Sequence, residues 1–251
     1  QTINYASCHD NMALFDRLTL STPDADFADR VRMNNLAAGI YLLSQGVPFM
    51  QAGEEILRSK PLPGGGFEHN SYCSPDSVNS IKWNDLGKET YAKNADYYRG
   101  LIAFRKAHPT LRLTTEEAVR EQVHPLEGLE PNVVGFHLRG SVDDPAQAII
   151  VLYNANRTPA TVELPKGKWN VCVTDQTAGT KTLLTVEGSV TVAPISTTVL
   201  TLESVSVSQP DSEAAAEEKK LPLLLGVTAA VTAAVGGTMA YLNHKRKKDK
   251  E

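Results

Sequence analysis

The strongest constraint on the fold of this chain is a change of pattern near residue 110. After this point, short segments rich in β-branched residues alternate with turn signals such as Asp143-Asp144-Pro145 and Glu187-Gly188. Short strands separated by turns at this spacing are typical of an antiparallel β-sandwich. We therefore predict a β-sandwich domain over residues 110–203, with strands at 133–138, 148–153, 160–164, 168–174, 182–186, 189–192 and 197–202.

The N-terminal part has a different order, which is strand, helix, strand. Residues 1–6 have the pattern of a short strand. A helix is predicted from 23 to about 46, with Thr22 as its N-cap and Pro23 at its first helical position. Residues 47–51 predict a buried strand. The connection between the two strands is long enough for them to pair in parallel.

A long irregular stretch and a second helix complete this part of the chain. Residues 54–84 are rich in Gly, Pro, Ser and Asn, and loops of this length in compact domains are usually functional or disordered. A helix with a broad apolar face is predicted from 90 to 107, and His108-Pro109 ends it.

The residues after the sandwich predict a stalk, a membrane anchor and a basic tail. Residues 204–220 are polar and typical of a flexible stalk, whereas residues 221–242 carry no charge and are long enough to cross a bilayer. The basic cluster within 243–251 outnumbers Lys219-Lys220 on the other flank. The positive-inside rule then predicts a single-pass protein on the extracellular face of the cell membrane, with a cytoplasmic C-terminus. A buried core helix is the alternative interpretation of 221–242.

Composition argues against several classes of protein. With 25 Lys+Arg against 29 Asp+Glu, the net charge is −4, so nucleic acid is not an expected partner. The 3 cysteines form no CxxC pair, which disfavours a disulfide scaffold and a zinc module. Residue 1 is Gln and no signal-type segment follows it, so we expect the chain to be the C-terminal part of a longer protein. A processed mature N-terminus is the alternative.

The end of the first predicted strand carries a carboxylate beside an imidazole, His9-Asp10. Parallel α/β barrels keep their chemistry at this end of their strands. The surrounding segment, Tyr5-Ala6-Ser7-Cys8-His9-Asp10-Asn11, resembles the last conserved segment of the α-amylase superfamily, in which a His-Asp pair ends the seventh strand of a (β/α)8 barrel. A His-Asp pair alone is a weak signal, since it also occurs in capped turns and as a surface pair.

Two further segments narrow the resemblance. Residues 46–55, Gly-Val-Pro-Phe-Met-Gln-Ala-Gly-Glu-Glu, look like strand eight of the same superfamily. Residues 70–83, Asn-Ser-Tyr-Cys-Ser-Pro-Asp-Ser-Val-Asn-Ser-Ile-Lys-Trp, are similar to a loop of type I pullulanases. These enzymes hydrolyse α-1,6 branch linkages in pullulan, starch and glycogen. With the trailing sandwich, the resemblance covers residues 1 to about 203.

The resemblance implies an α/β plus all-β fold, in which residues 1–109 are the C-terminal part of a catalytic (β/α)8 barrel with strands seven and eight. The antiparallel β-sandwich and then the transmembrane helix follow. We expect the sandwich to have its own core and to fold independently.

The resemblance also assigns roles to residues on two loops. Asp10 matches the carboxylate that stabilises the transition state, and His9 matches the histidine that hydrogen-bonds the sugar. Asn11 is expected to line the neighbouring cleft. The loop that borders the donor side supplies three further substrate-binding residues, Asn70, Tyr72 and Asp76. Ordinary turn chemistry is the alternative for these three, because Asn, Ser, Pro and Asp all favour turns.

A retaining glycosidase needs a nucleophile and an acid about 5–5.5 Å apart, and a third carboxylate can stabilise the developing positive charge. In the family, the nucleophile and the acid lie on earlier strands, so the chain alone is expected to be inactive. Glu54 and Glu55 match positions that support the barrel mouth, and Cys8 and Cys73 are interpreted as packing residues. No cofactor is required and no metal site is expected, while calcium use is left open.

The leading hypothesis is the C-terminal portion of a cell-surface pullulanase-type enzyme that cleaves α-1,6-glucosidic linkages with retention and takes an α-glucan as its partner. Another α-amylase-superfamily hydrolase, such as a neopullulanase or an α-amylase, is one alternative, and the loop at 70–83 argues against it. A plain structural stalk is a second alternative, but it would not need His9-Asp10 or the loop. A non-catalytic surface α-glucan-binding protein is a third. The sandwich offers it only Tyr153 and Trp169 as aromatic candidates.

Overall fold

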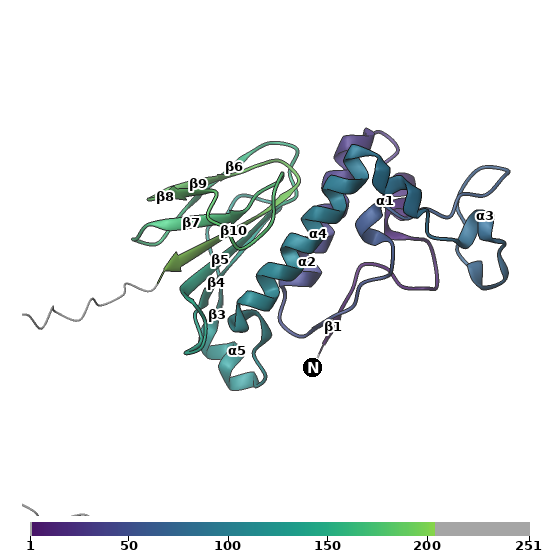
Figure 1. Cartoon of the computed structure of the whole chain (residues 1–251). Coiled ribbons are helices and arrows are strands. Elements are labelled where there is room, and N and C mark those ends of the chain that lie inside the picture. Colours follow the sequence, from purple (N-terminus) through teal and green to yellow (C-terminus); the bar gives the residue numbers. More distant parts are fainter. Residues whose placement is uncertain (1, 204–251) are drawn as a thin grey trace, which may run out of the picture. The chain divides into compact units, whose positions relative to one another are not determined.

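The computed structural model describes residues 2–203 (Figure 1). Its N-terminal part is a unit of two short strands that are joined by helices. It consists of β1 (Ile3–Asn4), α1 (Leu14–Ser21), α2 (Phe27–Leu43) and β2 (Val47–Pro48). The two strands pair in parallel, with Ile3 opposite Val47 and Asn4 opposite Pro48. The predicted parallel pairing is therefore confirmed.

The helix in this unit begins later than the sequence predicts. Asp26 is the N-cap of α2, because its carboxylate accepts a hydrogen bond of 2.7 Å from the backbone N–H of Asp29. Thr22 instead closes the preceding helix α1, where its hydroxyl donates to the carbonyl of Leu18 at 2.7 Å. The predicted start at residue 23 is wrong because Thr22, the predicted N-cap, is the C-cap of α1, a helix that was not predicted.

The prediction of a buried strand at 47–51 is also wrong in part. Val47 is 57% exposed and Phe49 is 45% exposed, although Gln51 is buried. Among residues 2–203, β1 and β2 pair with each other and with no third strand. Parallel sheets are buried when helices cover both of their faces, and Val47 and Phe49 lie where no such cover buries them in the described residues.

Short turns of helix interrupt the long loop, and the second predicted helix follows it. The predicted helix at 90–107 is confirmed as α4, and His108 is its C-cap. The elements from the loop onward are η1 (Glu54–Ile56), η2 (Ser71–Cys73), α3 (Asp76–Asn79), η3 (Trp83–Gly87), α4 (Glu89–Ala107), η4 (Pro109–Arg112) and α5 (Glu116–Gln122).

The remaining described residues form the predicted antiparallel sheets. One sheet has 6 strands in the order β3-β4-β5-β10-β7-β8, and β6 pairs with β9 in a second sheet of 2 strands. Each predicted strand is present, whereas β3 was missed. The strands are β3 (Val123–Pro125), β4 (Val133–Arg139), β5 (Ala146–Asn154), β6 (Ala160–Glu163), β7 (Trp169–Val173), β8 (Leu184–Val186), β9 (Ser189–Val192) and β10 (Ser196–Glu203).

The larger sheet has an apolar core on each face. One core lies within the sandwich and includes Val162, Trp169 and Leu200. The other core, which we call the shared core, joins the sheet to α2 and α4. Its buried residues are Leu36, Ala38, Tyr41, Leu42, Leu43, Tyr97, Tyr98, Leu101, Phe104, Leu111, Leu138, Ala146, Ile149, Val151, Tyr153, Cys172, Val173, Ile195 and Val199.

Each of the two helices has a glycine that packs closely against the sandwich. A Cβ at Gly39 of α2 would lie 2.1 Å from Oγ1 of Thr197. A Cβ at Gly100 of α4 would lie 2.0 Å from the carbonyl oxygen of Ala178. Both helices therefore touch the sandwich through their backbones.

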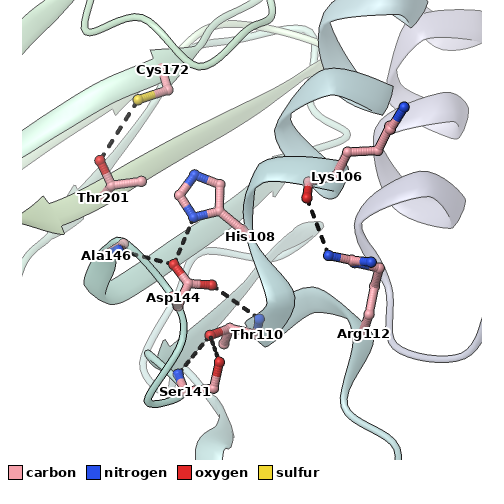
Figure 2. Close-up of polar contacts among 9 residues, drawn as sticks. All are labelled: Lys106, His108, Thr110, Arg112, Ser141, Asp144, Ala146, Cys172 and Thr201. Atoms are coloured by element: carbon pink, nitrogen blue, oxygen red, sulfur yellow. Dashed lines mark hydrogen bonds and ion pairs between the residues drawn. The ribbon is translucent and has the colours of Figure 1, made fainter.

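A buried histidine–aspartate pair fixes the end of α4 to the turn between β4 and β5 (Figure 2). Nδ1 of His108 contacts Oδ1 of Asp144 at 2.8 Å, and the two side chains are 8% and 0% exposed. The carboxylate also accepts the backbone N–H groups of Thr110, at 3.0 Å, and Ala146, at 2.9 Å. Burial opposes the charged form of Asp144, but its hydrogen bonds outweigh this effect and lower its pKa.

Several predictions about the C-terminal segments fall on residues that the structure does not describe. The stalk at 204–220, the transmembrane helix at 221–242 and the basic tail at 243–251 lie outside the described residues. Within residues 2–203, no helix combines the length and the apolar character that a bilayer crossing requires.

Candidate functional site

The His9-Asp10 pair lies on the loop that follows β1, and both residues are exposed. Nε2 of His9 is 3.5 Å from Oδ1 of Asp10, and the two side chains are 86% and 69% exposed. Asn11 follows with a φ of 64°, a left-handed conformation that asparagine adopts more readily than most residues. A carboxylate and an imidazole are thus presented side by side to solvent.

The second predicted group of residues lies on a loop that hydrogen bonds hold in place. Tyr72 is 82% exposed, and Asn70 and Asp76 are also exposed. The base of the loop is closed by Asn79, whose Nδ2 donates to the carbonyl of Ser71 at 3.0 Å. We call residues 70–79 the aromatic loop. Its site residues point outward from an ordered base.

A buried lysine connects the His9-Asp10 segment to the aromatic loop. Nζ of Lys60 lies 3.3 Å from the carbonyl oxygen of His9, 3.2 Å from that of Asn11 and 3.0 Å from Oγ of Ser71. Lys60 is 1% exposed. The structure therefore brings His9, Asp10 and Asn11 together with the base of the loop that carries Asn70 and Tyr72.

Asp76 is placed differently from the other five site residues. It lies in the first turn of α3, and its backbone carbonyl accepts hydrogen bonds from Ser80 and Lys82. These backbone contacts are those of an ordinary turn. Whether its carboxylate binds substrate stays a prediction.

Asp16 holds the backbone of the buried lysine by a hydrogen bond. Its Oδ2 accepts the backbone N–H of Lys60 at 2.7 Å, and the residue is fully buried. Burial raises the pKa of Asp16, and hydrogen bonds from Ser59 and Lys60 oppose that rise. Burial also lowers the pKa of Lys60, and the nearby charge of Arg58 lowers it further.

Glu54 belongs to a buried polar cluster beneath the site. Its carboxylate accepts the hydroxyl of Ser7 at 2.5 Å and that of Tyr41 at 2.8 Å, and Glu54 is 3% exposed. Asn34 donates to the hydroxyl of Tyr98 at 2.9 Å in the same cluster. Burial raises the pKa of Glu54, while the bonds from Ser7 and Tyr41 oppose the rise. The cluster ties the end of β1 to α2 and α4.

Sequence reasoning missed the residues that hold the site together, namely Asp16, Lys60, Ser71 and Asn79. Arg58-Ser59-Lys60 has the composition of a solvated surface segment, and Asp16 lies in a helix that was not predicted. The periodic spacing of apolar residues that predicts strands and helices could not reveal these four residues, because their contacts join residues far apart in the chain.

The exposed pair has a limited chemical repertoire by itself. A carboxylate can accept hydrogen bonds from hydroxyl groups and can stabilise developing positive charge, and an imidazole can hydrogen-bond an adjacent hydroxyl. Bond cleavage by a retaining glycosidase needs two further carboxyl groups about 5–5.5 Å apart. Among residues 2–203, no cluster of three or more His, Cys, Asp or Glu side chains is arranged to hold a metal ion.

Comparisons with known proteins identify what the chain resembles. Residues 119–177 match the family model of the pullulanase all-beta domain. The pullulanase of Bacillus subtilis is 34% identical over 166 residues, which cover 66% of this chain and 22% of the relative.

Two solved structures extend this likeness to the fold. A pullulanase from Bacillus acidopullulyticus is 40% identical with a TM-score of 0.74, over 80% of this chain and 24% of that chain. A pullulanase from Anoxybacillus sp. LM18-11, complexed with maltotriose, is 30% identical with a TM-score of 0.68, over 80% of this chain and 27% of that chain. The predicted resemblance to pullulanases is confirmed, and the chain shares their mixed helix/sheet fold with β-sandwich-like sheets. It spans about a quarter of the length of these structures.

Proposed function

We propose that this chain, which resembles pullulanases over most of its described length, is the C-terminal part of a debranching enzyme that hydrolyses α-1,6-glucosidic linkages in pullulan, starch or glycogen. The similar proteins support a pullulanase-type, α-glucan debranching family of glycoside hydrolases. The single observation that carries the proposal is the exposed His9-Asp10 pair beside the aromatic loop, in a chain 40% identical to a pullulanase over 80% of its length.

In this proposal, β1 and β2 are strands seven and eight of a (β/α)8 barrel. Their parallel pairing across a helical connection supports the assignment. Asp10 follows the carboxyl end of β1 and Glu54 follows that of β2, so both lie at one edge of the sheet. This is the edge at which barrel enzymes place their active sites.

Each exposed residue then has a defined task. The carboxylate of Asp10 faces the sugar ring and stabilises the oxocarbenium-like transition state, while His9 hydrogen-bonds a hydroxyl of the same sugar. Asn11 lines the adjacent cleft, and Asn70, Tyr72 and Asp76 border the donor side. Other strands of the barrel provide the nucleophile and the acid, and the linkage is cleaved with retention.

The substrate and the location are part of the proposal. The Anoxybacillus pullulanase was solved as a complex with maltotriose, which supports an α-glucan as the substrate here. We place the protein on the extracellular face of the cell membrane, with 221–242 as a single-pass helix and a cytoplasmic C-terminus. The charge-free run and the basic cluster that follows it support this location. Protease added to intact cells should release the part before about residue 210.

The alternative of a non-catalytic glucan-binding protein loses its main support in the structure. Its aromatic candidates in the sandwich, Tyr153 and Trp169, are both buried and cannot stack on a sugar. The exposed aromatic residue at the candidate site, Tyr72, lies instead on the loop that the debranching proposal uses.

Pullulan hydrolysis tests the proposal. The complete protein, expressed with the residues that the similar pullulanases have before this region, should release reducing ends from pullulan. NMR of the first products should show the α anomer. The 251-residue chain alone should release none, because two strands cannot close a barrel. Hydrolysis by the isolated chain, or a β anomer as first product, would refute this account.

A further inference from the structure

We propose that Lys60 is a positioning residue that fixes Asp10 and the aromatic loop relative to each other, and thereby sets the geometry of the glucan site. The inference rests on the proposed function for its catalytic meaning, but its structural part is independent of that function. Lys60 does not touch solvent, since it is 1% exposed, so it acts through the segments that it holds.

The ammonium group of Lys60 donates hydrogen bonds to the backbone on both sides of Asp10. One N–H is directed to the carbonyl of His9, at 3.3 Å, and another to the carbonyl of Asn11, at 3.2 Å. These carbonyls lie on either side of Asp10, whose side chain is 69% exposed. One buried group therefore fixes the backbone from which an exposed carboxylate projects.

The third contact of the ammonium reaches the other side of the site. Nζ lies 3.0 Å from Oγ of Ser71, which stands between Asn70 and Tyr72 in the chain. Oγ of Ser71 in turn lies 3.1 Å from Oδ1 of Asn79. Movement of the aromatic loop relative to Asp10 would break at least one of these bonds.

Hydrogen bonds to the backbone of Lys60 fix the position of the residue itself. Its N–H donates to Asp16 at 2.7 Å, and its carbonyl accepts the N–H of Glu68 at 2.8 Å. A buried ammonium is unfavourable unless its donors are satisfied, and here three oxygen atoms accept from it. The donors are directed at the two segments that carry the candidate site.

Lys82 provides a matched control, because it is also a lysine with three oxygen neighbours. Its Nζ lies 3.0 Å from the carbonyl of Asp76, 3.1 Å from that of Ser77 and 2.5 Å from Oγ of Ser80. All of these neighbours belong to residues 76–80. Loss of the Lys82 ammonium therefore removes a similar set of bonds without touching the His9–Asn11 segment.

The first test is NMR relaxation of the 251-residue chain, which needs no enzymatic activity. Lys60→Met keeps most of the side-chain volume and removes the donors. The backbone order parameter of Asp10 should fall from about 0.85 to below about 0.6. In Lys82→Met it should not change. A rigid Asp10 in Lys60→Met would overturn the proposal.

A second variant keeps the proposal testable if Lys60→Met does not fold. Ser71→Ala removes the third contact of the lysine, together with the bond from Oγ of Ser71 to Asn79, and keeps the contacts of the lysine to His9 and Asn11. Order should therefore be lost at residues 70–73 and kept at Asp10. Unchanged order at residues 70–73 would show that the lysine does not hold the loop, and would overturn that part of the proposal.

Steady-state kinetics of the complete protein on pullulan give the catalytic readout. Lys60→Met should lower kcat by about tenfold or more, because Asp10 acts in the transition state. Ser71→Ala should mainly raise KM, because the loop borders the donor side. Exposed Lys93, paired with Glu89 at 2.6 Å, supplies Lys93→Met as a neutral control. Equal kcat in Lys60→Met and wild type would overturn the proposal. An inactive wild-type protein would instead refute the proposed function, and the NMR experiment would then decide the positioning role of Lys60.

Discussion

Replacement of Gly100 by alanine tests how tightly α4 is packed against the sandwich. A Cβ at this position would lie 2.0 Å from the carbonyl oxygen of Ala178 and 2.4 Å from its carbonyl carbon. Non-bonded carbon and oxygen atoms normally stay about 3.3 Å apart or more. The backbone of α4 or of residue 178 must therefore move by about 1 Å.

Two effects of opposite sign decide how Gly100→Ala changes the free energy of unfolding. Alanine favours a helix over glycine by about 0.5–1 kcal/mol, which stabilises the variant. Overpacking of a close contact costs about 1–3 kcal/mol, and here the obstacle is a backbone carbonyl. Ala178 is also held by a β-bridge to the fully buried Val173, so it cannot move freely. We expect the cost of the clash to exceed the gain in helix propensity, so that Gly100→Ala lowers the free energy of unfolding by about 1–2 kcal/mol. The melting temperature should then fall by several degrees.

Urea denaturation followed by circular dichroism measures this difference. Gly179→Ala is the matched control, because a Cβ at that neighbouring position meets no atom within 4 Å. It should change the free energy of unfolding by less than about 0.5 kcal/mol. If Gly100→Ala is as stable as wild type or more stable, helix propensity outweighs the contact and the close approach inferred here is wrong.

Three further predictions concern single carboxylates. In the complete protein, Asp10→Asn should lower kcat on pullulan by about 10²–10³-fold without changing the melting temperature, and near-normal turnover would remove Asp10 from the catalytic set. Asp76→Ala should raise KM for pullulan if its carboxylate binds substrate, whereas a lower melting temperature with unchanged kinetics would favour a turn role. Asp144 has a lowered pKa in the folded state, so its stabilising effect is complete above the unfolded pKa near 3.8 and is lost as pH falls through the folded pKa. The difference in unfolding free energy between wild type and Asp144→Asn should therefore shrink from pH 5 to pH 2, and a constant difference would contradict the role of its ionised form.

The parts of the fold that were predictable are those set by local pattern. The strands of the sandwich follow from alternation and turns, and α4 follows from its apolar spacing and from His108-Pro109. The start of α2 was not predictable in this way. Thr22 and Asp26 are both good N-caps, and the choice depended on α1, which ends where the first cap stands.

In the candidate site, too, some residues could be predicted from the sequence and others could not. Its exposed residues, such as His9 and Asp10, were found through a resemblance, because they stand together in the sequence. Lys60 gave no such signal. A lysine is normally exposed, and only tertiary contacts with residues 49 and 51 positions away show that this one is buried.

The shared core has a consequence for protein engineering. A chimaera joined between residues 109 and 110 would combine α2 and α4 of one parent with the sheet of another. Tyr41, Leu101 and Phe104 would then meet foreign partners in place of Val151 and Val199. Small volume mismatches in a close-packed interior each cost stability. Grafting of this sandwich onto the helices of another protein therefore requires the inward-facing residues of α2 and α4 to be transplanted with it.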